Sequence, residues 1–168
     1  MCVTAMRIGG SVQWRAESGS LCAMQFEHYD ESLAQAFARS HEAAGGLAAF
    51  LAIRAVHSAP GALHVEIDAR PDLMTPFGNM HGGVIAALCD HVLGTVCYPV
   101  IPKGSWAATT EFKLNLIAPV TEGTVRAEAR IESLTKRTAV VQIRVVNGER
   151  LVCLAQGTVL VMPPRPAS

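Results

Sequence analysis

Residues 76–99 read PFGNMHGGVIAALCDHVLGTVCYP, and this stretch decides the fold. From Gly83 to Cys97 it is apolar on nearly every side, and a helix that is apolar all round is normally buried. Gly78-Asn79 supplies a turn and a candidate N-cap before the helix, and Pro99 prevents its continuation. At roughly 15 residues the helix is shorter than the ~20 that span a bilayer. We therefore predict a central buried helix and no membrane partner.

Strand patterns flank this helix. Residues 47–56 form a nearly continuous apolar run, and residues 63–70 alternate apolar and polar side chains, so each predicts a strand. Four further segments after the helix show strand character: 106–117, 124–134, 138–146 and 150–162. Short turns join the last four, including the tight-hairpin signal Asn147-Gly148, so neighbouring strands should be antiparallel. The pattern predicts an α+β domain whose antiparallel sheet wraps the long buried helix.

The 168 residues are predicted to form one domain. Residues 1–20 carry no periodicity and are expected to be a mobile N-terminal arm, and residues 163–168 are expected to be a tail. The domain itself should cover residues 21–162. It is expected to begin with a surface helix from about Asp30 to Ala44, capped by Asp30 and ended by Gly45-Gly46.

Composition excludes several classes of function. Half of the residues are hydrophobic, 17% are charged and the formal net charge is zero, which favours a packed globular protein and argues against a nucleic-acid partner. The five cysteines contain no C-x-x-C pair and no signal peptide is evident, so we expect reduced thiols in a cytoplasmic protein. The six histidines lack metal-binding spacing, so no metal site is expected.

Asp90 is the one carboxylate inside the apolar helix. Burying a carboxylate without a partner costs several kcal/mol or raises its pKa. Either Asp90 reaches a wet edge or a cationic partner, or it acts with His81-Gly82-Gly83 at the helix start. Two glycines there let a ligand approach the backbone, and free N–H groups at a helix N-terminus attract negative charge. This is the chemistry of an oxyanion hole, with a carboxylate about two and a half turns further along.

The motif His81-Gly82-Gly83, the Asp90 that follows after six residues, and the strand TTEFKLNLIAPV (residues 109–120) resemble a known family. They are similar to hotdog-fold acyl-CoA thioesterases of the phenylacetate-pathway and 4-hydroxybenzoyl-CoA thioesterase type, over roughly residues 47–162. The resemblance implies a hotdog fold and hydrolysis of aromatic or medium-to-long acyl-CoA thioesters. It implies no cofactor beyond the CoA of the substrate. It also implies a homodimer or homotetramer in which the helix carboxylate of one subunit lies beside the HGG turn of another.

Roles for individual residues follow from the resemblance. Asp90 would be the general base for a water molecule or the nucleophile itself, and the sequence leaves both open. The backbone N–H of Gly82, with that of Gly83, would stabilise the thioester oxygen as it gains charge, an effect typically worth about 3–4 kcal/mol. His81 would orient the turn, or it would only cap or pack the helix.

Two positions need a closer comparison. Thr109 matches a hydroxyl that in relatives helps to hold the water, although strand alternation places Thr110 on the apolar face instead. Many relatives carry an Asn six residues before the HGG histidine, where this chain has Thr75. Asn79 either substitutes for it or caps the helix.

Lys136 and Arg137 lie in a turn where relatives hold basic residues near the CoA phosphates; the other interpretation is a solvated hairpin turn. Two further functions stay open. A hotdog dehydratase or hydratase would generally pair a catalytic His with the acid. A non-catalytic acyl-CoA-binding or regulatory protein is compatible with Thr75, but no basic helix-turn-helix segment couples the chain to DNA.

Overall fold

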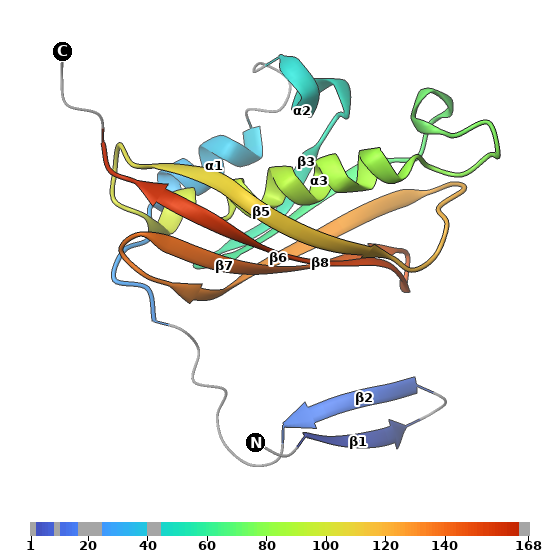
Figure 1. Ribbon diagram of the computed structural model, residues 1–168, viewed down its shortest axis with the longest axis horizontal. Coiled ribbons are helices and arrows are strands. Elements are labelled where there is room, and N and C mark those ends of the chain that lie inside the picture. Colours follow the sequence, from blue (N-terminus) through green and yellow to red (C-terminus); the bar gives the residue numbers. More distant parts are fainter. Residues whose placement is uncertain (1–2, 9–10, 17–24, 40–44, 165–168) are drawn as a thin grey trace.

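One long helix, α3 (Gly82–Thr95), lies along one face of a six-stranded antiparallel sheet (Figure 1). The structure is a computed structural model that describes residues 3–8, 11–16, 25–39 and 45–164. In spatial order the strands are β3 (Arg54–Ala59), β4 (Ala62–Asp68), β6 (Thr124–Leu134), β7 (Thr138–Asn147), β8 (Arg150–Met162) and β5 (Trp106–Leu116). Strands β3 and β5 are therefore the two edges. The predicted antiparallel sheet around a central helix is confirmed, but the short connection from β5 to β6 does not join neighbours, because β5 pairs with β8 and β6 lies between β4 and β7.

The helix and the sheet share one core. The buried side chains of α3 are Ile85, Leu88, Cys89, Val92 and Leu93. They face the inner residues of β4, β6, β7 and β8, which alternate with outward-facing residues along each strand. The sheet covers one side of α3 in the single chain, and this is the side on which these five residues lie.

By length and hydropathy alone, the segment Gly82–Val100 could cross a membrane. Half of it is buried inside this fold, however. The segment comprises α3 and the short 3-10 helix η2 (Tyr98–Val100), whose Pro99 follows the end of α3 as predicted. Its apolar character is therefore that of a core helix.

The segments before α3 differ from the sequence-based predictions in two places. The run 47–56 was predicted as one strand, but it contains the short helix α2 (Gly46–Phe50) and only the start of β3. Leu51 and Ile53 are buried between them, and Ala52 adopts a positive φ of 52°. A short apolar run looks the same in a buried helix and in a buried strand, so periodicity alone could not separate the two.

Residues Val3–Ile8 (β1) and Ser11–Ala16 (β2) form a two-stranded antiparallel sheet where no periodic structure was expected. The overlooked signal is the alternation of Val12, Trp14 and Ala16 with polar residues after a Gly-Gly dipeptide. The other residues of the predicted arm lie outside the described ranges.

The N-terminal helix α1 (Glu31–Arg39) begins where predicted. The Asp30 carboxylate accepts hydrogen bonds from the Leu33 N–H (2.9 Å) and the Ser32 hydroxyl (2.6 Å), so it caps the helix. Residues 40–44 of the predicted helix lie outside the described ranges, and Gly46 begins α2. Between β4 and α3 the chain forms a loop with one 3-10 turn, η1 (Pro71–Leu73).

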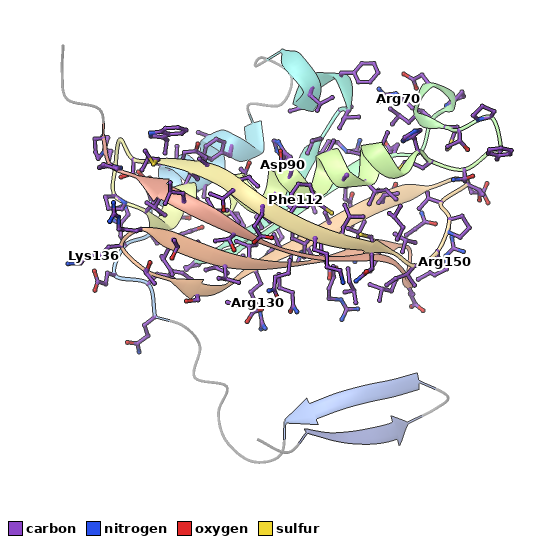
Figure 2. All side chains as sticks on the ribbon, viewed as in Figure 1. Arg70, Asp90, Phe112, Arg130, Lys136 and Arg150 are labelled. Atoms are coloured by element: carbon purple, nitrogen blue, oxygen red, sulfur yellow. The ribbon has the colours of Figure 1, made fainter. Side chains whose placement is uncertain are left out.

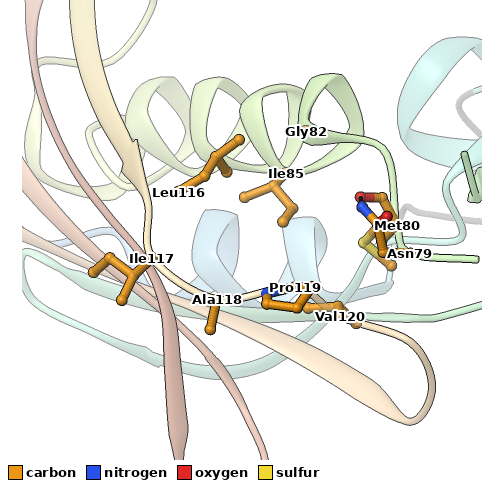
Figure 3. Close-up of a pocket in the computed structure, with 9 residues that line it drawn as sticks. All are labelled: Asn79, Met80, Gly82, Ile85, Leu116, Ile117, Ala118, Pro119 and Val120. Atoms are coloured by element: carbon orange, nitrogen blue, oxygen red, sulfur yellow. Dashed lines mark hydrogen bonds between the residues drawn. The ribbon is translucent and has the colours of Figure 1, made fainter. Parts of the chain in front are cut away.

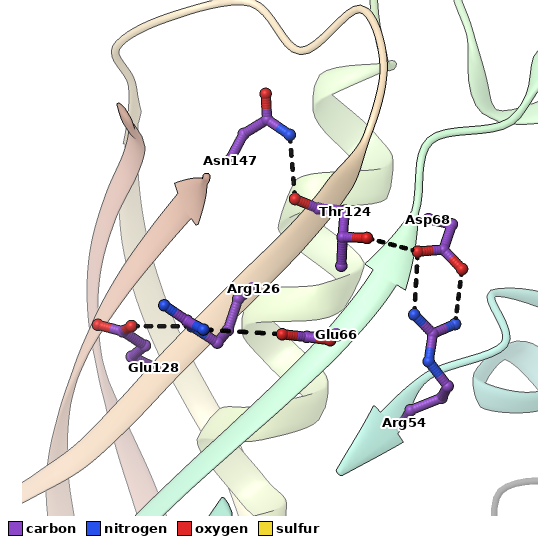
Figure 4. A network of polar contacts seen from close by, with 7 residues as sticks. All are labelled: Arg54, Glu66, Asp68, Thr124, Arg126, Glu128 and Asn147. Carbon is purple, nitrogen blue, oxygen red and sulfur yellow. Dashed lines mark hydrogen bonds and ion pairs between the residues drawn. The ribbon is translucent and has the colours of Figure 1, made fainter. Parts of the chain in front are cut away.

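The outer face of the sheet is polar and is held by contacts between strands (Figure 4). The Arg54 guanidinium donates two hydrogen bonds to Asp68, at 2.8 and 2.9 Å, and the Thr124 hydroxyl donates a third at 2.9 Å. These bonds hold the pKa of the Asp68 carboxyl below its usual value. On the neighbouring strand Arg126 forms an ion pair with Glu66 at 3.7 Å. The apolar face of the sheet is thus the one that faces α3.

Candidate active site

The start of α3 is capped by a histidine. The His81 Nδ1 accepts a hydrogen bond from the Gly83 N–H at 2.9 Å, so His81 is the N-cap. The His81 N–H in turn donates to the Leu73 carbonyl at 2.9 Å. The Gly82 N–H has no acceptor among the described residues. Of the two glycine N–H groups predicted for an oxyanion hole, the Gly82 group is therefore available and the Gly83 group is occupied.

Gly82 lies against the end of β5. A Cβ atom at this position would lie 2.7 Å from Leu116 Cδ1, which is too close for an unaltered side chain. Gly82 also lines a pocket of about 280 Å³ (Figure 3). The other lining residues are Asn79, Met80, Ile85, Leu116, Ile117, Ala118, Pro119 and Val120. The helix start thus borders a largely apolar pocket.

Asn79 does not cap α3, so that alternative is wrong. Its side chain is held within the loop before the helix: the Thr75 hydroxyl donates to Asn79 Oδ1 at 3.1 Å, and Asn79 Nδ2 donates to the Met80 carbonyl at 3.2 Å. The Thr75 N–H also donates to the Asn79 carbonyl at 2.7 Å. Thr75, which stands where many relatives carry Asn, is therefore bonded to Asn79, one of whose predicted roles was to substitute for that Asn.

Asp90 is exposed in the single chain. It forms no ion pair or side-chain hydrogen bond with the described residues. Figure 2 shows it on α3 above β5, and the neighbouring Leu93 packs near Phe112 of that strand. Eight residues separate Asp90 from Gly82, which is about 12 Å along a helix. One chain therefore does not bring the carboxylate and the Gly82 N–H together.

Thr109 lies on the helix-facing side of β5, contrary to the alternation argument. It pairs with the buried Val159, and further along Phe112 pairs with Gly157, so β5 contains one extra residue between these pairs. That residue belongs to a β-bulge at Thr110, and a bulge reverses the alternation that follows it. Thr109 therefore shares the face of Phe112. The prediction that Thr110 takes this place is wrong.

Lys136 and Arg137 form the exposed turn between β6 and β7, as predicted. Neither forms an ion pair with the described residues. The Arg137 carbonyl accepts from the Val161 N–H at 2.8 Å, and Val161 pairs with Ala107 of β5. The turn is therefore level with Ala107 of β5, five residues before Phe112, which lies beneath α3. Five residues of a strand span about 17 Å, so this is the distance along β5 between the turn and Phe112.

Burial disfavours the thiolate form of two cysteines in the described part of the chain. Cys89, Cys97 and Cys153 are free and buried. Burial raises the pKa of the Cys97 thiol to about 12. A hydrogen bond with Cys153, together with burial, raises the pKa of the Cys89 thiol, and the same bond lowers the pKa of the Cys153 thiol. Among the described residues, no group of three or more His, Cys, Asp or Glu side chains could hold a metal ion.

An antiparallel sheet holding one long helix is the hotdog arrangement, and comparison with known proteins places it among the thioester hydrolases. Residues 77–154 match the thioesterase superfamily, and the chain belongs to that family. It is 32% identical over 52% of its length to "Putative esterase ComA2" of Bacillus subtilis and covers 71% of that protein.

Two further comparisons agree with this assignment. The chain is 27% identical over 71% of its length to 1,4-dihydroxy-2-naphthoyl-CoA hydrolase of Listeria monocytogenes and covers 98% of that protein. It also resembles the solved structure of a variant of the phenylacetic acid degradation protein PaaI from Thermus thermophilus. That match has a TM-score of 0.62 and 29% identity, and it covers 67% of this chain and 95% of the other.

Proposed function

We propose that the protein hydrolyses acyl-CoA thioesters to a free acid and CoA, with Asp90 as general base or nucleophile. The observation that carries the proposal is the Gly82 N–H at the start of α3, which has no acceptor among the described residues and borders an apolar pocket. A relative named as a naphthoyl-CoA hydrolase supports CoA thioesters as the substrate class.

The reaction would use water and no cofactor. As general base, Asp90 takes a proton from water, and the oxygen of that water forms a bond to the thioester carbonyl carbon. The carbonyl oxygen gains negative charge, which the Gly82 N–H and the positive end of α3 stabilise. The intermediate then breaks its carbon–sulfur bond, and the proton passes to the departing CoA sulfur. As nucleophile, Asp90 would attack the carbonyl carbon, and the carbon–sulfur bond would break to release CoA thiolate and leave an anhydride. Water would then hydrolyse the anhydride to the free acid and the Asp90 carboxylate, and the proton released would pass to the thiolate. Thr109, on the helix face of β5, would help to hold the water.

The active site would be completed by a second copy of the chain. Asp90 and Gly82 are about 12 Å apart along α3, so Asp90 of one subunit would act beside Gly82 of the other. Apolar side chains on the exposed surface favour association: Leu47 is 60% exposed, Phe50 56% and Phe77 92%. The helix that carries Leu47 and Phe50 lies on the same side of the sheet as α3 (Figure 1). The assembly would be a homodimer or a pair of homodimers.

The exposed turn Lys136-Arg137 would bind the phosphates of CoA. Both cations lack an ion-pair partner among the described residues, and their distance from the Phe112 region suits a ligand whose phosphates are remote from its thioester. Arg can bind a phosphate through two parallel hydrogen bonds, and Lys adds a point charge. The buried free thiols favour a reducing compartment, so we place the reaction in the cytoplasm.

The first test replaces the carboxylate. Asp90→Asn should lower the rate of thiol release from acyl-CoA by at least ~100-fold and leave the fold intact, since it removes a general base at constant size. Glu111→Gln, a matched change of an exposed acid on β5, should have no effect. A folded Asp90→Asn protein that keeps most of its activity would overturn the proposal.

The second test removes the proposed oxyanion donor and examines whether the site is shared. Proline suits the first position of a helix, and the preceding His81 has an extended backbone (φ −63°, ψ 132°) that a following proline tolerates. Gly82→Pro should therefore delete the N–H with little change of backbone and abolish hydrolysis. Proline and alanine at position 82 both place a Cβ atom against Leu116, but Gly82→Ala keeps the backbone N–H. The alanine variant should therefore be more active than the proline variant.

Mixing the inactive Asp90→Asn and Gly82→Pro proteins should restore activity. A mixed dimer contains one site with an intact Asp90 from one chain and an intact Gly82 from the other. Random exchange of subunits should recover about a quarter of the parent activity. If the mixture stays inactive although mixed dimers form, the two groups do not act across subunits.

A further inference from the structure

Two histidines face each other across the hairpin formed by β3 and β4. The turn Pro60-Gly61 joins the two strands, and their register places His57 directly opposite His64. The ring centroids are 4.7 Å apart, and the ring planes are inclined at 45°. Because the two histidines are distant in sequence and come together only in the hairpin, the spacing motifs of metal ligands did not reveal them.

A β-bulge directs His57 to the face of the sheet on which His64 lies. Ala55 pairs with the buried Val65. The next pair is His57 with His64, so β3 contains one extra residue, Val56, between the two pairs. In a regular strand Ala55 and His57 would both point to the inner face. The bulge reverses this alternation and brings His57 beside His64 on the outer face.

The two imidazoles contact each other but are not bonded to other side chains of the described residues. His57 is exposed and His64 is half-buried, and neither ring forms a hydrogen bond or an ion pair within the described part of the chain. On the other side of His64 lies Glu128 of β6, whose carboxylate accepts a hydrogen bond from Arg126 Nε at 3.0 Å (Figure 4). Glu128 therefore adds negative charge near the pair, and the ring nitrogens stay available for a ligand.

The separation of the rings suits two ligands of one metal ion. A metal–nitrogen bond of about 2.1 Å and a ring radius of about 1.1 Å place each ring centroid roughly 3.2 Å from the ion. Two such rings are then about 4.5 Å apart at the right angle of square-planar coordination and about 5.2 Å apart at the tetrahedral angle. The observed 4.7 Å lies between these two values.

We propose that His57 and His64 together bind one divalent transition-metal ion, with water in the remaining coordination positions. Imidazole suits Zn²⁺, Ni²⁺ and Cu²⁺, whereas Mg²⁺ prefers oxygen ligands and should not bind the pair. The bound ion would join the edge strand β3 to β4. The site lies on the outer face of the sheet, away from α3, so this inference goes beyond the proposed hydrolysis and does not depend on it.

Isothermal titration calorimetry of the full chain with Ni²⁺, and with Mg²⁺ as a comparison, tests the site. His57→Gln and His64→Gln should each weaken Ni²⁺ binding at least ~tenfold, because the second imidazole of the pair binds at high effective concentration. The double change should cost much less than the sum of the two single losses, since either change alone breaks the chelate. His28→Gln removes an exposed histidine outside the pair, and this matched control should bind Ni²⁺ like the parent.

Unfolding in urea, followed by circular dichroism, gives a second readout. An ion that binds the folded chain stabilises it, so Ni²⁺ should raise the urea midpoint of the parent and of His28→Gln more than that of His57→Gln. Metal binding by the N-terminal amine or by cysteines is common to all these variants and cancels in the comparison. Equal Ni²⁺ affinity in the parent and in both single variants of the pair overturns the inference.

A loss of affinity confined to one of the two histidines also overturns the inference, because a single imidazole would then hold the ion. So does binding of Mg²⁺ as tight as that of Ni²⁺, which would indicate carboxylate ligands. None of these results bears on thiol release from acyl-CoA. Conversely, a protein that hydrolyses no acyl-CoA should still bind Ni²⁺ through this pair, so the two proposals fail separately.

Discussion

Replacing Gly157 with alanine tests how α3 is seated on the sheet. A Cβ atom at Gly157 would lie 2.5 Å from Leu93 Cδ1, 2.6 Å from Phe112 Cβ and 2.7 Å from the Glu111 carbonyl oxygen. Non-bonded carbon atoms pack best at about 3.5–4.0 Å, so the added methyl group overlaps all three atoms. The end of Leu93 can rotate away. The other two atoms are fixed to the backbone of β5 and can move only if the strand moves.

The expected cost follows from these contacts. Overpacking a core typically costs about 1–3 kcal/mol, and two rigid contacts out of three place Gly157→Ala near the upper end. Alanine recovers about 0.5–1 kcal/mol because it restricts the unfolded chain more than glycine does. The free energy of unfolding should therefore fall by about 2 kcal/mol. For a chain of 168 residues this lowers Tm by about 4–8 °C.

Urea and thermal unfolding followed by circular dichroism would measure this loss, at several protein concentrations because association contributes to stability. Gly94→Ala is the control. Gly94 lies in the last turn of α3, and a Cβ there meets nothing within 4 Å, so the better helix propensity of alanine should raise stability by up to about 1 kcal/mol. A Gly157→Ala protein as stable as the parent would refute the described packing of α3 against β5 and β8.

Three further predictions concern the cap, a histidine pair and the CoA phosphates. His81→Ala should lower the free energy of unfolding in urea by about 1 kcal/mol because the Gly83 N–H loses its acceptor, whereas His81→Asn, which can also cap, should not. Burial, followed by the charge of the cross-strand His57, lowers the pKa of His64 below 6.5. The unfolded chain therefore binds the proton more readily than the folded chain does. The free energy of unfolding should fall as the pH drops through 6.5 and below. His64→Gln should flatten this dependence, and an unchanged slope in urea titrations at a series of pH values would contradict it. The double change Lys136→Ala/Arg137→Ala should raise KM for acyl-CoA about fivefold and leave kcat nearly unchanged, with less effect at high salt. Steady-state kinetics with a truncated pantetheine thioester, which lacks the phosphates, should show no change.

Much of the fold could be predicted because its signals are local. The continuous apolar stretch before Pro99 identified the central helix, and alternation identified the strands that follow it. Asp30 and the turn at Asn147-Gly148 also act within a few residues of their own positions, and the structure agrees with both. The HGG turn identified the helix start for the same reason.

The site depended more on neighbours that are distant in the sequence. The alternation rule assumes a regular strand, and the bulge at Thr110 broke it, so only the pairing of β5 with β8 assigned Thr109 to the helix face. The sequence left open whether Asn79 caps the helix or takes the place of the family Asn, and its bonds to Thr75 and Met80 exclude the cap.

The sequence by itself determined that the chain folds as an antiparallel sheet with one apolar helix, that an HGG turn begins this helix, and that a carboxylate lies further along it. Hydrophobic period and turn chemistry act over a few residues, so they can be recognised without the fold. Only the tertiary structure decided that Asp90 is exposed, that the Gly82 N–H is available while that of Gly83 is bonded to His81, and that residues 47–56 divide into a helix and a strand. Exposure and hydrogen-bond partners depend on which distant segments pack against a residue, and the sequence near that residue does not contain this information.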